Sequence, residues 1–500
     1  MYIMSRESCQ RVDKYAINKI GIPSIVLTEN AANEVFFRIK DLGESYVVFC
    51  GEGNNGGDGL AIGRKLINLN KDVIFVIINE RNRFTSDFEI NLKILKNLDA
   101  TIIYINKEED ISIIKNISNL GKIAVDCIFG VGLNRNISIL CNKIIDFINM
   151  SFDNIISVDV PSGLNADTGE VMGNSIKAKR TYSFEVMKKG FLNYKALEYL
   201  GKLEIVSIGI PKEAKEINSE KNFILNKKDY RKLIKIRKPF GHKGNYGKVS
   251  IIAGSRGFTG AAKITTNSCI KTGAGLTTLI TEGYVQDILS CTIVEAMTIN
   301  LEESNKAIKN LEEANVIAIG PGIENVEIYK DLIKNIKNID NKFFIVDAGA
   351  LEGFSKDKVI MDKMKNKAVF TPHPGEMARI INKSIGYVEE NRMKVAKDYA
   401  KSNNIVVLLK GYNTVITDGN NTYINPKGNS KMASGGMGDS LTGIIASLIG
   451  QGNGLLEGAL LGAYIHGLSG EKAGENKYSV TASDIIENIP LVMENIIIEN

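Results

Sequence analysis

The sequence predicts an α/β protein of two domains, each a parallel β-sheet covered by helices on both faces. Its 500 residues, 44% of them hydrophobic, suffice for more than one buried core. Short apolar, β-rich runs alternate with Gly-containing turns and amphipathic stretches, which is the pattern of βαβ units. This alternation starts again after a polar stretch at residues 211–228. We therefore expect a Rossmann-like three-layer sandwich over residues 1–217 and a second α/β sandwich over residues 218–500.

The individual elements follow from the same patterns. In the first domain we expect strands at residues 46–50, 73–78, 122–127 and 155–160, and a helix at residues 59–70. In the second domain we expect strands at residues 248–253, 316–319, 343–346, 367–371 and 406–410, and a buried helix at residues 441–448. Sheets of this kind bind ligands at the carboxyl ends of their strands, where most of the Gly-rich runs of this chain lie.

Composition and charge argue against several classes of protein. The net charge is +5 and basic residues are interleaved with acidic ones, so nucleic-acid binding is not indicated. The 6 Cys form no C-x-x-C pair and there are 3 His, which disfavours a disulfide framework or a zinc site. No apolar run approaches the ~18 residues that span a bilayer. We expect a cytoplasmic protein without a membrane partner.

A Gly-rich loop follows the first predicted strand. Residues 51–59 read G-E-G-N-N-G-G-D-G and contain G-x-G-x-x-G between a strand and a helix. Glycines there let backbone N–H groups approach a pyrophosphate at a helix N-terminus, although a simple tight turn would read the same way. Asp58 places a carboxylate where a redox dinucleotide fold would avoid one.

Three further loops end strands and should cluster with the first. They read D-C-I-F-G-V-G from Asp126, D-V-P-S-G from Asp159, and S-F-E-V-M-K, which leads to Lys188. A carboxylate that closes a parallel strand is costly to bury, so we expect Asp126 and Asp159 to be functional. The alternative is that each Asp caps a helix.

These motifs, in this order, resemble the epimerase domain of NAD(P)H-hydrate repair enzymes over roughly residues 5–215. The resemblance rests on N-N-G-G-D-G, D-x-x-x-G-x-G, V-D-V-P-S-G-L-N-A-D-T-G and the early run L-T-E-N-A-A. It implies hydrated NADH or NADPH (NAD(P)HX) as substrate and Asp159 as the acid/base that interconverts the hydrate epimers. It also implies a potassium ion held by oxygen ligands from Asn55, Asp126 and Ser162. The family often has A-P-K-x-G where this chain has V-M-K-K-G, so Lys188 aligns without the preceding Pro.

The resemblance assigns the dinucleotide contacts of this domain to Asn54, Asn55, Gly56, Gly57, Asp58, Gly130, Val131, Gly132, Leu133, Asn134, Arg135, Asn136 and Asp159.

The second domain contains a longer motif, G-N-S-K-M-A-S-G-G-M-G-D-S-L-T-G at residues 428–443. Successive glycine amides at a helix N-terminus form an anion hole for phosphate. Asp439 in the same turn can accept a proton from a hydroxyl that attacks phosphorus, and its burial should raise its pKa. The alternative is a glycine-rich helix entry with a capping Asp.

This run resembles the ribokinase-like superfamily, and other runs narrow the resemblance to its hydrate dehydratase branch over most of residues 225–495. They include T-G-A-A from Thr259, G-P-G from Gly320, T-P-H-P-G-E-M from Thr371 and L-K-G-Y-N-T from Leu409. The resemblance implies dehydration of S-NAD(P)HX to NAD(P)H at the expense of ADP, giving AMP and phosphate, with Mg²⁺ on the phosphates. It also implies a homo-oligomer, a tetramer or larger.

Two sets of contacts follow from this resemblance. The hydrate is assigned to Ala261, Gly322, His373 and Asp439. ADP is assigned to Lys410, Gly411, Tyr412, Asn413, Thr414, Asn429, Lys431, Met432, Ala433, Ser434, Gly435, Gly436, Met437 and Gly438. His373, between two prolines, can alternatively shape a turn. The family commonly has a second Asp where this chain has Gly349, which argues against a metal contact there.

Other functions remain open at this point. A ribokinase-like vitamin kinase fused to a Rossmann-like module would leave phosphate on its product, whereas a dehydratase releases it. The first domain can also be a binding module without catalysis. A dehydrogenase is disfavoured, because no proton-donor motif accompanies the glycine fingerprint.

Overall fold

The computed structural model describes every residue except 116, 118–122, 338 and 499–500. The chain divides into two compact units, Met1–Asn222 and Phe223–Asn500. The sequence places this division after residue 217, inside helix α8 (Lys212–Asn218). Position 122, the first residue of one predicted strand, lies outside the described residues.

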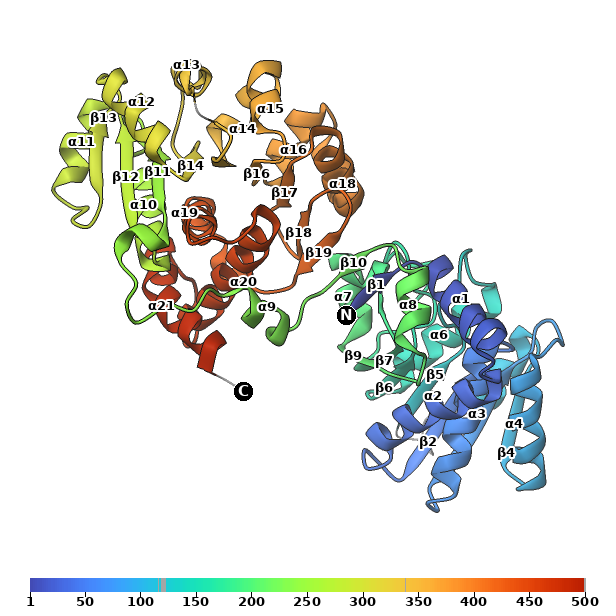
Figure 1. Ribbon diagram of the computed structural model, residues 1–500. Helices are drawn as coiled ribbons and strands as arrows, with labels where there is room; N and C mark the ends of the chain where they lie inside the picture. The colour runs from blue at the N-terminus through green and yellow to red at the C-terminus, as the bar shows by residue number, and fades with distance from the viewer. Residues whose placement is uncertain (116, 118–122, 338, 499–500) are drawn as a thin grey trace. The chain divides into compact units, whose positions relative to one another are not determined.

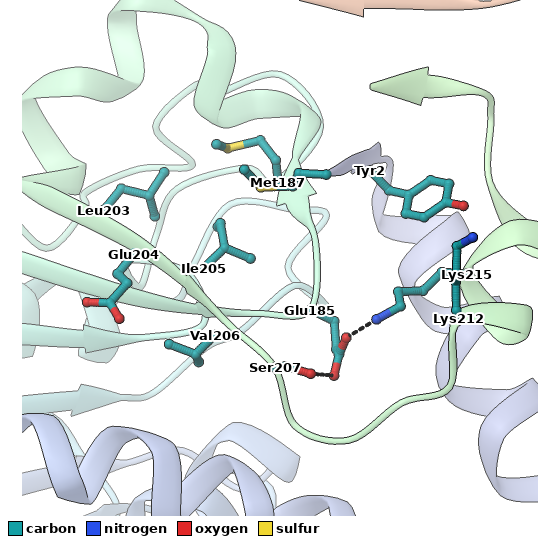
Figure 2. A pocket seen from close by; sticks show the side chains of 11 residues that line it. Tyr2, Glu185, Met187, Leu203, Glu204, Ile205, Val206, Ser207, Lys212 and Lys215 are labelled. Carbon is teal, nitrogen blue, oxygen red and sulfur yellow. Dashed lines mark hydrogen bonds and ion pairs between the residues drawn. The ribbon is translucent and has the colours of Figure 1, made fainter. Parts of the chain in front are cut away.

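The first unit is built on a sheet of seven parallel strands (Figure 1). Their order is β4-β3-β2-β5-β6-β7-β9, and every neighbouring pair is parallel. The strands are β2 (Ser45–Cys50), β3 (Asp72–Ile78), β4 (Thr101–Ile105), β5 (Ile123–Cys127), β6 (Ile155–Val158), β7 (Arg180–Phe184) and β9 (Lys202–Val206). Strand β6 is two residues shorter than the predicted 155–160, because Asp159 turns the chain out of the sheet with φ +64°.

Helices cover both faces of this sheet, which confirms the predicted fold class. One core packs α2 (Ser24–Ile39), α3 (Asn54–Ile67) and α4 (Ser86–Asn97) on one face. A second core packs α5 (Ile111–Ile114) and α6 (Ile139–Ser151) on the other face. A third cluster joins α1 (Arg6–Tyr15), α2 and α8 near the short parallel pair β1 (Tyr2–Met4) and β8 (Met187–Lys188). This unit also contains the π-helical turn Ala16–Ile20 and α7 (Leu197–Leu200).

Helix α3 begins at Asn54, so the predicted start at residue 59 is wrong. Its glycines are poor helix formers, but close packing requires them. A Cβ on Gly59 would lie 2.7 Å from Cβ of Cys127, and one on Gly63 would lie 2.3 Å from the Phe75 ring. Tertiary contact therefore outweighs local propensity here.

The second unit contains nine strands in the order β13-β12-β11-β14-β15-β16-β17-β18-β19. The strands are β11 (Lys248–Ile252), β12 (Leu276–Thr281), β13 (Met297–Asn300), β14 (Val316–Ile319), β15 (Phe343–Val346), β16 (Ala368–Phe370), β17 (Val406–Leu409), β18 (Thr414–Thr417) and β19 (Thr422–Asn425). The pairs β17–β18 and β18–β19 are antiparallel, and the other neighbouring pairs are parallel.

The large core of this unit lies between the sheet and α10 (Thr259–Thr272), α19 (Met437–Gly450), α20 (Leu455–Ala473) and α21 (Ala482–Ile498). The remaining helices are α9 (Lys227–Leu233), α11 (Gly283–Ser290), α12 (Ser304–Glu313), α13 (Glu327–Asn335), α14 (Gly349–Ser355), α15 (Lys358–Met364), α16 (Pro374–Ile381), α17 (Ile385–Glu390) and α18 (Arg392–Asn403). In Figure 1, helices α12 to α16 and α18 lie on the opposite side of this sheet from α19 and α20.

Helix α19 begins at Met437, four residues before the predicted helix at 441–448, because Gly436 caps it with φ +84°. Asp439 therefore lies in the first helical turn. Across the described part of the chain, no helix combines the length and apolar character that crossing a bilayer requires.

Candidate active sites

A cavity of about 830 Å³ opens in the first unit beside the carboxyl ends of its central strands. Most of the residues assigned to the hydrated dinucleotide line it: Asn54, Asn55, Asp58, Gly130, Val131, Gly132, Leu133, Asn134, Arg135 and Asp159. Gly56 and Gly57 lie instead behind the wall, where they face Phe88, and Asn136 is exposed outside the lining. The parallel topology thus brings together loops that are far apart in sequence.

Asp159 and Lys188 form a buried ion pair on the cavity wall. Nζ of Lys188 lies 2.9 Å from Oδ1 of Asp159, and the two side chains are 4% and 11% exposed. The other Asp159 oxygen accepts a hydrogen bond from the backbone N–H of Val131 at 3.0 Å. Burial lowers the pKa of Lys188, but the Asp159 charge outweighs this effect and the pKa is raised overall. Lys188 therefore stays protonated, and its ammonium group fixes the position of the Asp159 carboxylate in the cavity.

A second buried carboxylate, Asp126, organises the neighbouring loop. Its oxygens accept hydrogen bonds from Oγ of Ser157 at 2.8 Å and from the backbone N–H and Oγ of Ser162 at 2.9 and 2.5 Å. Burial raises the pKa of Asp126, while these hydrogen bonds act in the opposite direction. Asp126 and Ser162 are thus held together, as the predicted cation site requires.

Asn55 lies beside this loop with an unpartnered side chain. It is 8% exposed, and within the described residues neither its amide oxygen nor its amide nitrogen has a hydrogen-bond partner. A Cβ built on Gly130 would lie 3.3 Å from Cγ of Asn55 and 3.1 Å from Oδ2 of Asp159. Buried amides without partners are rare, so this oxygen is available to a ligand or a cation.

Sequence reasoning missed further carboxylates of this cavity. Asp13 on α1 and Asp87 on α4 line it beside Asp58. Burial, with the charges of Asp159, Asp87 and Asp13, raises the pKa of Asp58 well above its usual value. The sequence contains a signal for Asp13, because this charged residue lies on the same helical face as the apolar residues Cys9 and Ile17, four positions before and after it.

In the second unit, four charged side chains meet around the first turn of α19. Nζ of Lys410 lies 2.7 Å from Oδ1 of Asp347 and 3.8 Å from Oε2 of Glu376. Burial alone would raise the pKa of Asp347, but Lys410 and Thr442 stabilise its ionised form and the pKa is lowered. Burial raises the pKa of Asp439 to about 6, with the charge of Asp347 acting in the same direction and Lys410 against it. The predicted rise in the pKa of Asp439 is confirmed.

The two runs assigned to ADP approach each other. A Cβ built on Gly438 would lie 3.1 Å from Nζ of Lys410, so the end of β17 and the start of α19 share one site. Asn429 and Lys431 have local roles as well, because Asn429 Oδ1 accepts from the Lys431 N–H at 3.0 Å and Lys431 Nζ donates to the Gly474 carbonyl at 2.8 Å.

The residues assigned to the hydrate are partly brought together. A Cβ built on Gly322 would lie 2.9 Å from Cβ of Ala261, so these two residues adjoin. His373 caps α16, since its Nδ1 accepts hydrogen bonds from the N–H groups of Gly375 and Glu376 at 3.0 and 3.3 Å. His373 thus shapes this turn, which is the alternative role that the sequence offered beside contact with the hydrate.

A buried histidine that sequence reasoning missed supports the start of α19. Nε2 of His466 on α20 lies 3.0 Å from Oγ of Ser440, next to Asp439. Burial lowers the pKa of His466 to about 4, so the ring is neutral near neutral pH.

Comparisons with known proteins find a match for each of the two units. Residues 24–190 match the family described as YjeF-related protein N-terminus, and residues 249–491 match NAD(P)H-hydrate dehydratase. The bifunctional NAD(P)H-hydrate repair enzyme of Moorella thermoacetica is 34% identical, over 99% of this chain and 97% of its own. The chain belongs to this family of repair enzymes.

Other relatives give the same picture. The repair enzyme of Escherichia coli is 31% identical over 93% of this chain and 88% of its own. The ADP/ATP-dependent NAD(P)H-hydrate dehydratase of Bacillus subtilis, solved with ATP and Mg²⁺, shares 28% identity and a TM-score of 0.50, covering 55% of this chain and 98% of its own. A ribokinase-like protein of Enterococcus faecalis has a TM-score of 0.51 at 30% identity, covering 55% of this chain and 96% of its own.

Proposed function

We propose that this repair enzyme epimerises the hydrates of NADH and NADPH in its first unit and dehydrates the S epimer in its second. The observation that carries the proposal is the pairing of two sites in one chain: a dinucleotide-sized cavity with the Asp159–Lys188 ion pair, and a glycine-rich helix start with Asp439. Family membership over the whole chain supports both activities.

In the first unit, Asp159 moves the proton during epimer interconversion. Lys188 pairs with the Asp159 carboxylate, and the Val131 N–H fixes the orientation of that carboxylate. The cavity-lining residues of the 54–58 and 130–135 segments hold the dinucleotide around the reacting ring. Asp159→Ala distinguishes this reading from a binding module, because a binder would show no slowing of interconversion.

The oxygen set near the cavity fits a potassium ion. Asn55 supplies a buried amide oxygen without a partner, and Asp126 and Ser162 supply a carboxylate and a hydroxyl. Hard oxygen donors with a single carboxylate suit a monovalent cation. When bound, the ion would add positive charge next to the loop that carries Asp126 and Ser162.

In the second unit, Asp439 accepts the proton of the hydrate's hydroxyl while that oxygen attacks the terminal phosphate of ADP. The amides of residues 435–438 at the start of α19 stabilise the phosphate charge. Phosphate is a far better leaving group than hydroxide, so the ring nitrogen can expel it and restore the dihydropyridine. Lys410–Thr414 and Asn429–Gly438 hold the nucleotide, while Ala261, Gly322 and His373 border the hydrate.

Magnesium is proposed to arrive on the nucleotide phosphates. Asp347 is a buried carboxylate close to the start of α19, and it already contacts Lys410 and accepts a hydrogen bond from Oγ1 of Thr442 at 2.8 Å. Mg²⁺ commonly binds through substrate phosphates and few protein groups, so such a site needs no dedicated cage. A cytoplasmic location and a homo-oligomer of four or more chains remain part of the proposal.

The deciding assay supplies both NADHX epimers with ADP or ATP and follows the recovery of reduced-nicotinamide absorbance and the release of phosphate. We expect full recovery of both epimers with stoichiometric free phosphate. If the reduced-nicotinamide absorbance recovers neither with ADP nor with ATP, dehydration is refuted. A stable phosphorylated product would favour the kinase alternative. Consumption of one epimer only, with the other changing at its spontaneous rate, would refute the epimerase activity.

A further inference from the structure

Asp13 is a carboxylate of the first cavity that the proposed mechanism does not use. Helix α1 contributes one wall of the cavity through Cys9, Gln10, Val12 and Asp13. Cys9 and Val12 also pack in the buried cluster that joins α1 to α2 and α8. The start of the helix is anchored by the backbone N–H of Arg6, which donates to Asp167 at 2.6 Å. Asp13 is therefore held in place at the cavity wall.

The charged groups that interact with Asp13 come from three neighbouring segments of the chain. They are Lys188 and Glu185 from the segment around β8, Asp159 from the end of β6, and Asp58 from α3. Asp159 is tied to Lys188, whereas the Asp13 carboxylate has no hydrogen-bond or ion-pair partner in the part of the chain that the structure describes.

Asp13 and Asp159 consequently differ in their surroundings. Water in the cavity reaches Asp13, but the surrounding protein desolvates its carboxyl and raises the pKa to about 6, with Lys188 opposing and the charges of Asp159 and Glu185 adding to the rise. The cavity thus offers one carboxylate paired with an ammonium group and one carboxyl group that can carry a proton near neutral pH. Two acids in different environments are the usual basis of acid/base assignments.

Epimerisation by loss and return of water requires two proton transfers, one to the oxygen that leaves the carbon and one from the oxygen that returns to it. Hydroxide leaves poorly, so the departing hydroxyl needs a proton, and the water that returns must lose one. We propose that Asp13 is the second proton-transfer residue of this site and works as the partner of Asp159. The inference rests on the proposed epimerase function.

The Asp13 carboxyl protonates the hydroxyl, the C–O bond breaks to release water, and the ring nitrogen lone pair forms the C=N⁺ bond. Water then adds to the other face of the ring, returning the electron pair to nitrogen, and Asp159 takes its proton. The product state has Asp13 ionised and Asp159 protonated, which is the state that the reverse reaction needs.

The test is Asp13→Asn in the full-length protein, with Asp13→Glu as the carboxyl-retaining variant. Glu7→Gln is the matched control, because Glu7 lies on the same helix with a side chain 81% exposed. The assay follows conversion of R-NADHX into S-NADHX by chromatography, above the spontaneous rate. We expect Asp13→Asn to lose about 100-fold or more in rate, Asp13→Glu to recover part of it, and Glu7→Gln to match the wild type.

A pH profile adds a readout that a structural role would not change. The wild-type rate should fall as pH rises above about 6, because Asp13 must carry a proton, and this limb should vanish in Asp13→Asn. A rate within about threefold of wild type in Asp13→Asn would overturn the inference. So would a retained limb, or equal losses in Asp13→Asn and Asp13→Glu together with a lower unfolding midpoint. If the wild type does not accelerate conversion at all, the proposed epimerase function itself fails.

Discussion

Replacement of Asp439 by Asn should separate nucleotide binding from chemistry in the second unit. The amide keeps the shape of the side chain in the first turn of α19 but cannot accept the hydroxyl proton. General-base catalysis contributes about 10²–10⁴-fold, which corresponds to about 3–5.5 kcal/mol in the activation barrier. We expect kcat for S-NADHX dehydration to fall by that factor, while the KM for ADP changes little.

The dehydration rate should also depend on pH in a direction set by the pKa of Asp439. Burial raises the pKa of Asp439 to about 6, and a base acts in its ionised form. The wild-type rate should therefore rise through about pH 6 and level off near neutrality, whereas the variant should show no such limb. Reduced-nicotinamide absorbance at saturating ADP measures the rate, with an enzyme-free reaction at each pH to subtract acid breakdown of the hydrate.

Asp362→Asn is the matched control, since Asp362 is a half-exposed surface residue paired with Lys365. It should behave as the wild type. A variant at Asp439 that keeps more than about one tenth of the wild-type kcat, or a wild-type rate that is flat across pH 6, would refute the assignment of Asp439 as the base.

Three further changes test the two units. Lys188→Met removes the partner of buried Asp159 and should lower the free energy of unfolding by about 3–5 kcal/mol, and an unchanged urea midpoint would contradict this. Asn55→Leu should abolish the extra thermal stabilisation that we expect KCl to give the wild type over NaCl; equal stabilisation of both proteins would exclude Asn55 as a ligand. Gly443→Ala places a Cβ 2.2 Å from the Thr265 carbonyl oxygen, so it should cost about 1–3 kcal/mol in urea unfolding. Gly260→Ala is the control, because Gly260 lies in helix α10 and its Cβ would meet no atom within 4 Å, and it should change the free energy of unfolding by less than about 0.5 kcal/mol.

Where sequence prediction failed, the cause was packing between distant segments. The helix start at Asn54 depends on glycines that local propensity disfavours, and only contacts with Cys127 and Phe75 explain them. That His373 Nδ1 caps α16 likewise emerged only from the fold, and the assignment of His373 to the hydrate stays a prediction. The ion pair between Lys188 and Asp159 was not predicted. The fold brings these two residues together, and their separation along the sequence follows no pattern that indicates a contact.

The sequence by itself determined the two α/β units, most of their strands and the motif residues at the ends of those strands. It could do so because apolar periodicity and glycine placement are local properties, and because parallel topology puts carboxyl ends at one edge. Only the tertiary structure decided which charges meet. Asp159 is held by Lys188, Asp347 by Lys410, and Asp13 has no such partner in the described chain. Proton affinity depends on burial and neighbouring charge, which no stretch of sequence contains.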